Sequence, residues 1–456
     1  MKRVLAIASI SLRSATRSKV VLCLLALLAV SIVVLPLTAK GDGTAAGQAR
    51  ILLTYTLGLV GLILSISTLW AGCAAIAQEV DDCQIHLVVT KPVTRFEIWL
   101  GKWLGLLALN ALLLGASGLT VYGLLKWTVR DDVVSEEDRV VLDEEVLVAR
   151  RVVMPDLKDD GVEEDARELV NQRIEQNTMP PGLSEENAVE AARIALLTRA
   201  YSAPRGYVLN WTFTVPRGLR QSESLHVRYR FSSSDVLAQK VTGRWRASAP
   251  NSETMFETVG EFAPQKHHSF PISPDAIGAD GTVEIQFQNE NPSQVTILFS
   301  PDDGISLLVN QSSFEANFIR ALMIIFIHLA FLGALGVTAG SLLSLPVAAF
   351  VAVFVMVLLK SSPFIQGMAS RDFLVTFSDP EATRSILDVV LGVTFKVMEF
   401  VVSPLEAPAA LEALGAGQMV LWKWVRQMFG VKILYSLVMA VVGSWLFNRR
   451  ELGLPS

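Results

Sequence analysis

The sequence predicts an α-helical polytopic membrane protein with six transmembrane helices and an extracytoplasmic α+β insertion that contains an antiparallel β-sandwich. Hydrophobic residues make up 51% of the 456 residues, and only 18% are charged. Several apolar runs exceed the roughly 18 residues that a helix needs to cross a hydrocarbon core of about 30 Å. A long polar stretch separates the third run from the fourth, and its second half alternates apolar and polar residues.

The apolar runs define six spans, approximately 20–38, 51–77, 100–125, 319–342, 346–361 and 430–447. They divide the chain into three parts. Residues 1–125 hold an N-terminal interfacial helix and three spans. Residues 126–318 form the extracytoplasmic domain, helical at first and a β-sandwich from about 205. Residues 319–456 hold the last three spans and an outward helical segment at about 382–429.

Basic residues beside the spans orient the chain in the cytoplasmic (inner) membrane. Five of them precede the first span without an acidic residue among them: Lys2, Arg3, Arg13, Arg17 and Lys19. Arg449 and Arg450 follow the last span. The positive-inside rule places both termini in the cytoplasm, as an even number of spans requires. Residues 4–18 form either an interfacial helix or a frayed basic tail.

Charge and composition exclude several classes of function. The net charge of −5 argues against a nucleic-acid partner. Cys23, Cys73 and Cys83 all lie in or beside the first two spans, so the insertion has no disulfide. The adjacent His267 and His268 would point to opposite faces of a strand, which disfavours a metal site. With no zinc spacing and no nucleophile–histidine arrangement, we expect neither an enzyme nor a cofactor bound by this chain.

Polar residues inside the predicted spans are few. Asn110 and His328 are the two that stand out, and each is interpreted either as a helix-pairing residue or as part of a transport path. An ion-coupled transporter would carry an ionisable relay in its spans. Its apparent absence predicts that any transport draws its free energy from another protein.

The cytoplasmic segment 79–102, EVDDCQIHLVVTKPVTRFEIWLGK, joins the second and third spans. Acidic residues come first and an apolar patch follows, so a short helix along the membrane surface is expected. Lys91-Pro92 ends that helix, and Thr94 caps another that starts near Arg95 and leads into the third span. A plain cytoplasmic connection with juxtamembrane charges is the alternative.

This segment resembles the loop between the second and third spans of ABC-2-type transporter permeases, which reads E-x-E-x-G-T-I-x-x-L-L-S-K-P-V-S-R-x-x-I-x-x-G-K. Cys83 and Gln84 depart from the Gly-Thr of that pattern. The C-terminal Phe447–Leu452, FNRREL, is also similar to the family's usual ending. The residues in register are Glu79, Asp81, Ile85, Val88, Val89, Thr90, Lys91, Pro92, Val93, Thr94, Arg95, Ile98, Gly101 and Lys102.

The resemblance implies that the segment is a coupling helix that docks on a separate ABC ATPase subunit. The chain has no G-x-x-x-x-G-K-[ST] phosphate loop, so ATP and Mg²⁺ would bind the partner. Six spans is half the usual number for such a pore, so the resemblance implies a homodimer or a second, similar permease subunit. We also expect an exporter. The expected coupling residues are Glu79, Asp81, Ile85, Lys91, Pro92, Arg95, Gly101 and Lys102.

Residues 126–318 change pattern from helical to period two. ENAVEAARIALLTRA, 186–200, has helical spacing, and the acidic groups 136–138 and 163–165 are expected on solvated helix faces. Four later stretches alternate as half-buried strands. Their expected inward residues are Tyr207, Leu209, Trp211 and Phe213; Leu225, Val227, Tyr229 and Phe231; Val283, Ile285 and Phe287; and Val295, Ile297 and Phe299, with His226, Arg228 and Arg230 outward.

A sandwich of this kind would present a surface to an extracytoplasmic protein or a glycan, although Trp211 and Trp245 are expected in its core. Two outward helices are predicted within 382–429, the second carrying Trp422 and Trp424 ahead of the last span. The main alternative to a permease is therefore a membrane scaffold or receptor that displays the sandwich. A related alternative is mechanotransmission, in which an ATPase moves the outer domain.

Overall fold

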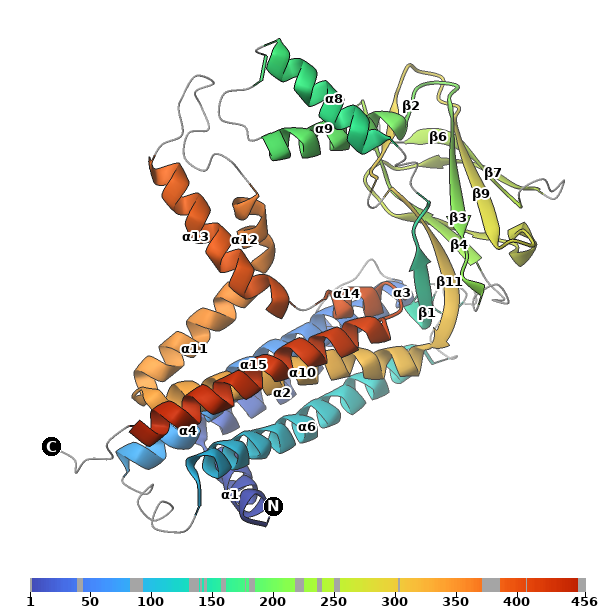
Figure 1. The fold of residues 1–456 in the computed structure, drawn as a ribbon. Coiled ribbons are helices and arrows are strands. Elements are labelled where there is room, and N and C mark those ends of the chain that lie inside the picture. The colour runs from blue at the N-terminus through green and yellow to red at the C-terminus, as the bar shows by residue number, and fades with distance from the viewer. Residues whose placement is uncertain are drawn as a thin grey trace. The chain divides into compact units, whose positions relative to one another are not determined.

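The computed structural model describes most of the chain, and Figure 1 shows its fold. The described residues are 2–38, 44–82, 93–130, 139, 142, 146–156, 161–176, 178–179, 185–217, 225–235, 240–249, 255–301, 304–370, 386–406 and 408–449. The chain divides into two compact units. The helical unit comprises 1–148, 313–366 and 397–456, and the insertion unit comprises 149–312 and 367–396.

The described residues of the helical unit include four helices that are long and apolar enough to cross a membrane. They are Ala45–Asp81, Arg95–Thr128 (α6), Phe314–Leu342 (α10) and Trp422–Arg449 (α15). The first of them runs through α3 (Ala45–Ile51), a π-helical turn (Leu52–Thr56) and α4 (Leu57–Asp81).

Two bent helix pairs raise the number of candidate spans in the described residues to six. One joins α1 (Lys2–Arg17) to α2 (Lys19–Thr38) with a bend of 68°, and the other joins α11 (Leu345–Lys360) to α12 (Ser362–Ala369) with a bend of 63°. Each predicted span therefore falls on a helix. The helices α6, α10 and α15 each continue beyond the predicted apolar span into more polar residues.

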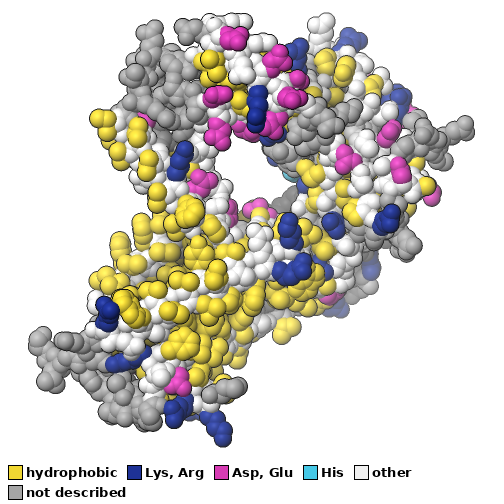
Figure 2. All heavy atoms as spheres, viewed as in Figure 1, with side chains coloured by type: hydrophobic (Ala, Val, Ile, Leu, Met, Phe, Trp, Pro, Cys, Tyr) yellow, Lys and Arg dark blue, Asp and Glu magenta, His cyan; other side chains and the backbone are white. Residues whose placement is uncertain are grey.

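Exposed apolar side chains cover much of the visible face of the helical unit (Figure 2). On α11, Phe350 is 72% exposed, and on α15 Val441 is 64% exposed. In water such a surface would be unusual, since contiguous apolar patches of this kind mark contact with a membrane or a partner. The apolar helices thus suggest a membrane location for the protein.

Helix α10 lies against α4 and α15 inside the helical unit. Glycines let the α4 and α10 backbones meet: a Cβ added at Gly72 would lie 3.0 Å from the Gly336 Cα. Close approach of small residues is the usual basis of helix association in a membrane, where lipid removes the hydrophobic driving force. Gly115 of α6, by contrast, has open space where a Cβ would lie.

The segment just before α15 is fixed to α10 by one buried asparagine. The Asn317 side chain donates to the Gln418 carbonyl at 2.7 Å and accepts from the Val420 backbone N–H at 2.7 Å. A short helix, α14 (Ala410–Gly415), precedes this segment, and α13 (Ile386–Val402) lies earlier. The prediction of a separate helix carrying Trp422 and Trp424 was wrong, because both residues lie on α15 itself.

The insertion unit is built on three antiparallel sheets. Their orders are β1-β11-β4-β8, β2-β10-β5 and β3-β9-β6-β7. The strands are β1 (Val148–Val153), β2 (Ser202–Ala203), β3 (Val208–Thr214), β4 (Leu225–Tyr229), β5 (Phe231–Ser233), β6 (Val241–Ser248), β7 (Met255–Phe262), β8 (His268–Ile272), β9 (Thr282–Asn289), β10 (Ile297–Phe299) and β11 (Ile305–Ser313).

One aromatic-rich core joins residues of all three sheets. Trp211 of β3 stacks on Trp245 of β6 with ring centroids 6.1 Å apart, and both are buried as predicted. Tyr229 of β4 lies 4.2 Å from Trp245 between ring centroids. Because successive strand residues alternate faces, the period-two patterns of the sequence placed most of these residues inward correctly.

Three strand predictions were wrong in detail. Tyr207 precedes β3 and is 55% exposed, so it does not share the buried face. The stretch 225–231 is not one strand, because it breaks at Arg230 into β4 and β5, which join different sheets. His226, expected outward, is only 4% exposed. It pairs with Pro271 of β8 and with Leu308 of β11, which is 1% exposed, so the face of β4 opposite the aromatic core is also buried here.

The helical part of the insertion unit consists of α8 (Val162–Glu175) and α9 (Glu185–Ala200). They pack through small and branched side chains, among them Ala166, Val170 and Ala192. Glu163, Glu164 and Asp165 are exposed in the first turn of α8, as predicted. Acidic residues in that position interact favourably with the helix dipole. Residues 136–138 lie outside the described residues.

Candidate coupling site and buried polar pairs of the helical unit

Helix α6 begins where the sequence predicted. Thr94 is its N-cap, and its hydroxyl accepts from the Glu97 backbone N–H at 3.2 Å. The Glu97 carboxylate accepts in return from the Thr94 backbone N–H at 2.9 Å. This capping box satisfies two N–H groups that the first turn would otherwise leave without partners. The start of the third predicted span is thus fixed at Arg95.

An ion pair joins the two helices that flank the segment 83–92. Lys102 of α6 donates to the Glu79 carboxylate of α4, and the Lys102 side chain is almost completely buried. A buried ammonium is costly unless it is paired, so this contact holds the end of α4 against α6. Two expected coupling residues therefore contact each other directly.

Arg95 contacts the end of α15. Its guanidinium carbon lies 4.4 Å from the ring centroid of Phe447, a cation–π geometry. Phe447 is the first residue of the FNRREL ending and is 1% exposed. The two sequence stretches that carry the family resemblance therefore meet in the folded helical unit.

Gly101 lets α1 lie directly on α6. A Cβ at this position would approach the Cβ and Cγ2 atoms of Ile7 to 2.7 Å. A Cβ at Gly105, one turn further, would lie 2.6 Å from the Ala8 carbonyl oxygen. Only glycine fits at such separations, so the N-terminal helix is packed against α6. A frayed N-terminal tail, the alternative left open by the sequence, is not what the structure has.

The remaining expected coupling residues are not brought together by the described structure. Asp81 lies at the exposed end of α4. Ile85, Lys91 and Pro92 lie outside the described residues, as does the predicted surface helix between Cys83 and Pro92.

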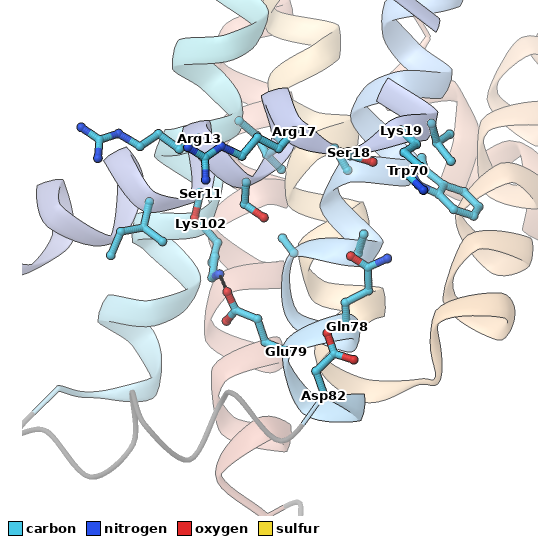
Figure 3. A pocket seen from close by; sticks show the side chains of 18 residues that line it. Ser11, Arg13, Arg17, Ser18, Lys19, Trp70, Gln78, Glu79, Asp82 and Lys102 are labelled. Carbon is cyan, nitrogen blue, oxygen red and sulfur yellow. Dashed lines mark hydrogen bonds and ion pairs between the residues drawn. The ribbon is translucent and has the colours of Figure 1, made fainter. Parts of the chain in front are cut away.

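A cavity of about 730 Å³ opens between α1, α2, α4 and α6 (Figure 3). Arg13 and Arg17 of α1 and Lys19 of α2 lie on one side of it, and Gln78, Glu79 and Asp82 of α4 lie on the other. The Glu79–Lys102 pair forms part of its wall. These basic residues indicated the orientation of the chain, but the cavity could not be predicted from them because it depends on the bend between α1 and α2.

Asn110 is buried in the helical unit and joins two helices. Its Oδ1 accepts from the Thr68 hydroxyl of α4 at 2.9 Å, and its Nδ2 makes no hydrogen bond with a described residue. This contact matches the helix-pairing interpretation of Asn110.

His328 of α10 faces a buried lysine that the sequence analysis overlooked. The Lys432 Nζ of α15 lies 2.8 Å from the His328 Nδ1, and Lys432 is 1% exposed. The prediction that polar residues inside the spans are few, with Asn110 and His328 standing out, therefore missed Lys432. Lys432 lies inside the predicted span 430–447, so a check of that span for charged residues would have found it. No carboxylate among the described residues pairs with it.

The described residues contain no group of three or more His, Cys, Asp or Glu side chains that could hold a metal ion. His267 and His268 differ in exposure, and the His268 Nε2 lies 2.8 Å from the Ala263 carbonyl oxygen.

Comparison with known proteins assigns no family. No protein-family model matches the sequence, and no curated protein gives a significant match.

Proposed function

We propose that this chain is the permease subunit of an ABC-2-type transporter, driven by a separate ATPase subunit through the segment 79–102. The observation that carries the proposal is the position of the segment between two helices whose ends are tied together. Glu79 at the end of α4 pairs with Lys102 near the start of α6. Force applied to the segment would therefore move both helices together.

Contacts of α4 and α6 supply a route for that movement. Helix α4 packs closely on α10 through Gly72 and Gly336, and the start of α6 contacts the end of α15 through Arg95 and Phe447. Packed helices transmit displacement because their interiors compress little. ATP-driven closure of the motor subunits would then rock the helical unit between inward- and outward-facing states, and export is the proposed direction.

The number of candidate spans and the sheets of the insertion unit support the remaining parts of the proposal. Four long helices and two bent pairs fit six spans, with both termini in the cytoplasm and the protein in the inner membrane. Six spans call for a second permease subunit, either another copy of this chain or a similar one. The shared core of the three antiparallel sheets fits an extracytoplasmic β-sandwich that receives a protein or a glycan. ATP and Mg²⁺ would bind the motor subunit.

The test is affinity purification of the tagged chain from detergent-solubilised native membranes, followed by mass spectrometry and an ATPase assay. We expect a stoichiometric subunit with a phosphate loop, whose recovery falls at least about tenfold on Arg95→Glu. Arg426→Glu is the matched control, since Arg426 is an exposed arginine on α15, 21 residues from Phe447. Purification without an ATPase, under conditions that preserve a known ABC complex, would refute the proposal and favour a scaffold or receptor.

Mechanotransmission is a second candidate, favoured by the connection between β11 and α10. Strand β11 ends at Ser313, whose hydroxyl accepts from the Ala316 backbone N–H at 3.4 Å as the N-cap of α10. No loop separates strand from helix, so movement of α10 would pull on the insertion unit directly. A flexible Gly-Ser insertion after Ser313 separates the two functions. Loss of the ATPase-driven movement of the insertion unit, with ATP hydrolysis by the partner retained, indicates mechanotransmission, whereas unchanged movement of the insertion unit excludes it.

A further inference from the structure

The wall of the cavity between α1, α2, α4 and α6 contains polar side chains that have no partner among the described residues. Arg13, Arg17 and Lys19 line it and make no ion pair with the described residues. Ser11 also lines it, and its hydroxyl is buried, at 5% residue exposure, with no hydrogen-bond partner among the described residues. A buried hydroxyl without a partner costs free energy, so it indicates a place where a ligand or water supplies one.

The charges in the cavity favour an anion. Glu79 is neutralised by Lys102, which leaves Asp82 as the one acidic side chain in the wall that has no cationic partner among the described residues. Three basic side chains, those of Arg13, Arg17 and Lys19, stand against it. Guanidinium groups suit phosphate because their planar donors match its oxygens.

The apolar part of the cavity favours a lipid over a soluble anion. Ile10, Ala71, Ala74 and Leu106 line it, and so does Val20 at the start of α2. From Val20 the exposed apolar side of α2 continues through Leu27, 51% exposed, and Val30, 56% exposed. A headgroup in the cavity could therefore leave its acyl chains along α2 without exposing them to water.

We propose that this cavity binds the headgroup of an anionic phospholipid, with its phosphate held by Arg13 and Arg17 and its acyl chains against α2. Basic pockets between membrane helices bind such headgroups because each Lys or Arg near the surface contributes electrostatic attraction. The bound lipid would join α1 to α4 beside the Glu79–Lys102 pair. The proposal requires only a membrane location and does not depend on the transporter assignment.

The test is native mass spectrometry of the full chain released from detergent, titrated with phosphatidylglycerol and with phosphatidylcholine of identical acyl chains. We expect phosphatidylglycerol to bind in preference. Arg13→Ala with Arg17→Ala should weaken its binding about thirtyfold. The matched control is Lys2→Ala with Arg3→Ala, which removes the same charge from the same helix outside the cavity and should change binding by less than about threefold. Equal loss in both double variants would overturn the proposal, since it would indicate a diffuse surface effect.

Two further measurements keep the result interpretable. Ala75→Phe fills the cavity without changing its charge, and we expect it to abolish phosphatidylglycerol binding while the melting curve shows that the chain is folded. Unchanged lipid binding in that variant would overturn the site. Competition with glycerol 3-phosphate tests the source of the phosphate. We expect no displacement at concentrations equal to the lipid, and full displacement would show a soluble phosphate as the ligand instead.

Discussion

Lys432 and His328 face each other in the interior of the helical unit, with 2.8 Å between the Lys432 Nζ and the His328 Nδ1. His328 is the partner that the described structure gives this lysine. We expect His328→Leu to lower the free energy of unfolding by about 1–3 kcal/mol, because the amine is left buried without a hydrogen bond. The measurement is thermal unfolding in detergent.

A double-mutant cycle provides the control for this pair. Lys432→Met removes the buried amine altogether, so adding it to His328→Leu should recover most of the lost stability. Additive losses in the double variant would show that Lys432 and His328 act independently. Transport assays on Lys432→Met alone would then report whether the amine serves a path through the helices.

The close approach of α1 to α6 predicts opposite effects of one substitution at two glycines. Gly101→Ala should lower stability by about 1–3 kcal/mol, because the new Cβ would meet the Ile7 Cβ at 2.7 Å. Gly115→Ala on the same helix has nothing within 4 Å of the new Cβ, and we expect it to raise stability by up to about 1 kcal/mol. Limited proteolysis should cleave residues 1–18 faster in Gly101→Ala than in Gly115→Ala. Equal protection of the two variants would contradict the packing of α1.

The Glu79–Lys102 pair predicts a recovery by charge exchange. Glu79→Ala leaves the buried Lys102 ammonium unpaired and should cost about 2–4 kcal/mol of stability. Exchanging the charges, Glu79→Lys with Lys102→Glu, restores a pair and should regain at least half of that loss. Unfolding in detergent measures both. If the exchanged variant were no more stable than Glu79→Ala, the surroundings of each charge, and not the attraction between the two charges, would determine the stability.

Tyr229 predicts alkaline sensitivity of the insertion unit. Burial raises the pKa of Tyr229 above its usual value near 10, because ionisation in the aromatic core would place an unsolvated charge there. The unfolded chain loses that proton near pH 10 while the folded chain keeps it to a higher pH. The contribution of protonated Tyr229 to the free energy of unfolding is therefore constant below about pH 10 and decreases as the pH rises above that value.

Tyr229→Phe should accordingly lose less stability than the unchanged protein between pH 9 and pH 11. Thermal unfolding across this range is the measurement. The control is Tyr207→Phe, whose ring is 55% exposed and which should not alter the alkaline loss. Parallel curves for the Tyr229 variant and the unchanged protein would argue against a protonated, buried Tyr229.

The sequence by itself determined the elements whose pattern is local. The apolar runs located the helices, because a membrane requires long uninterrupted apolar stretches with internal hydrogen bonds. Thr94 and Glu97 specified the start of α6, since a capping box is formed by residues three positions apart. The alternation of Leu209, Trp211 and Phe213 identified a buried strand face, because every second residue of a strand points to the same side.

Tertiary structure decided everything that depends on residues far apart in the chain. His226 is buried together with Leu308 of the neighbouring strand β11, far away in the chain, and the 225–231 stretch divides because its two halves join different sheets. The meeting of Lys432 with His328, and of Arg95 with Phe447, joins helices separated by about a hundred residues or more. Packing geometry alone brings these groups together, so no local pattern in the sequence could reveal the pairs or the cavity beside Lys102.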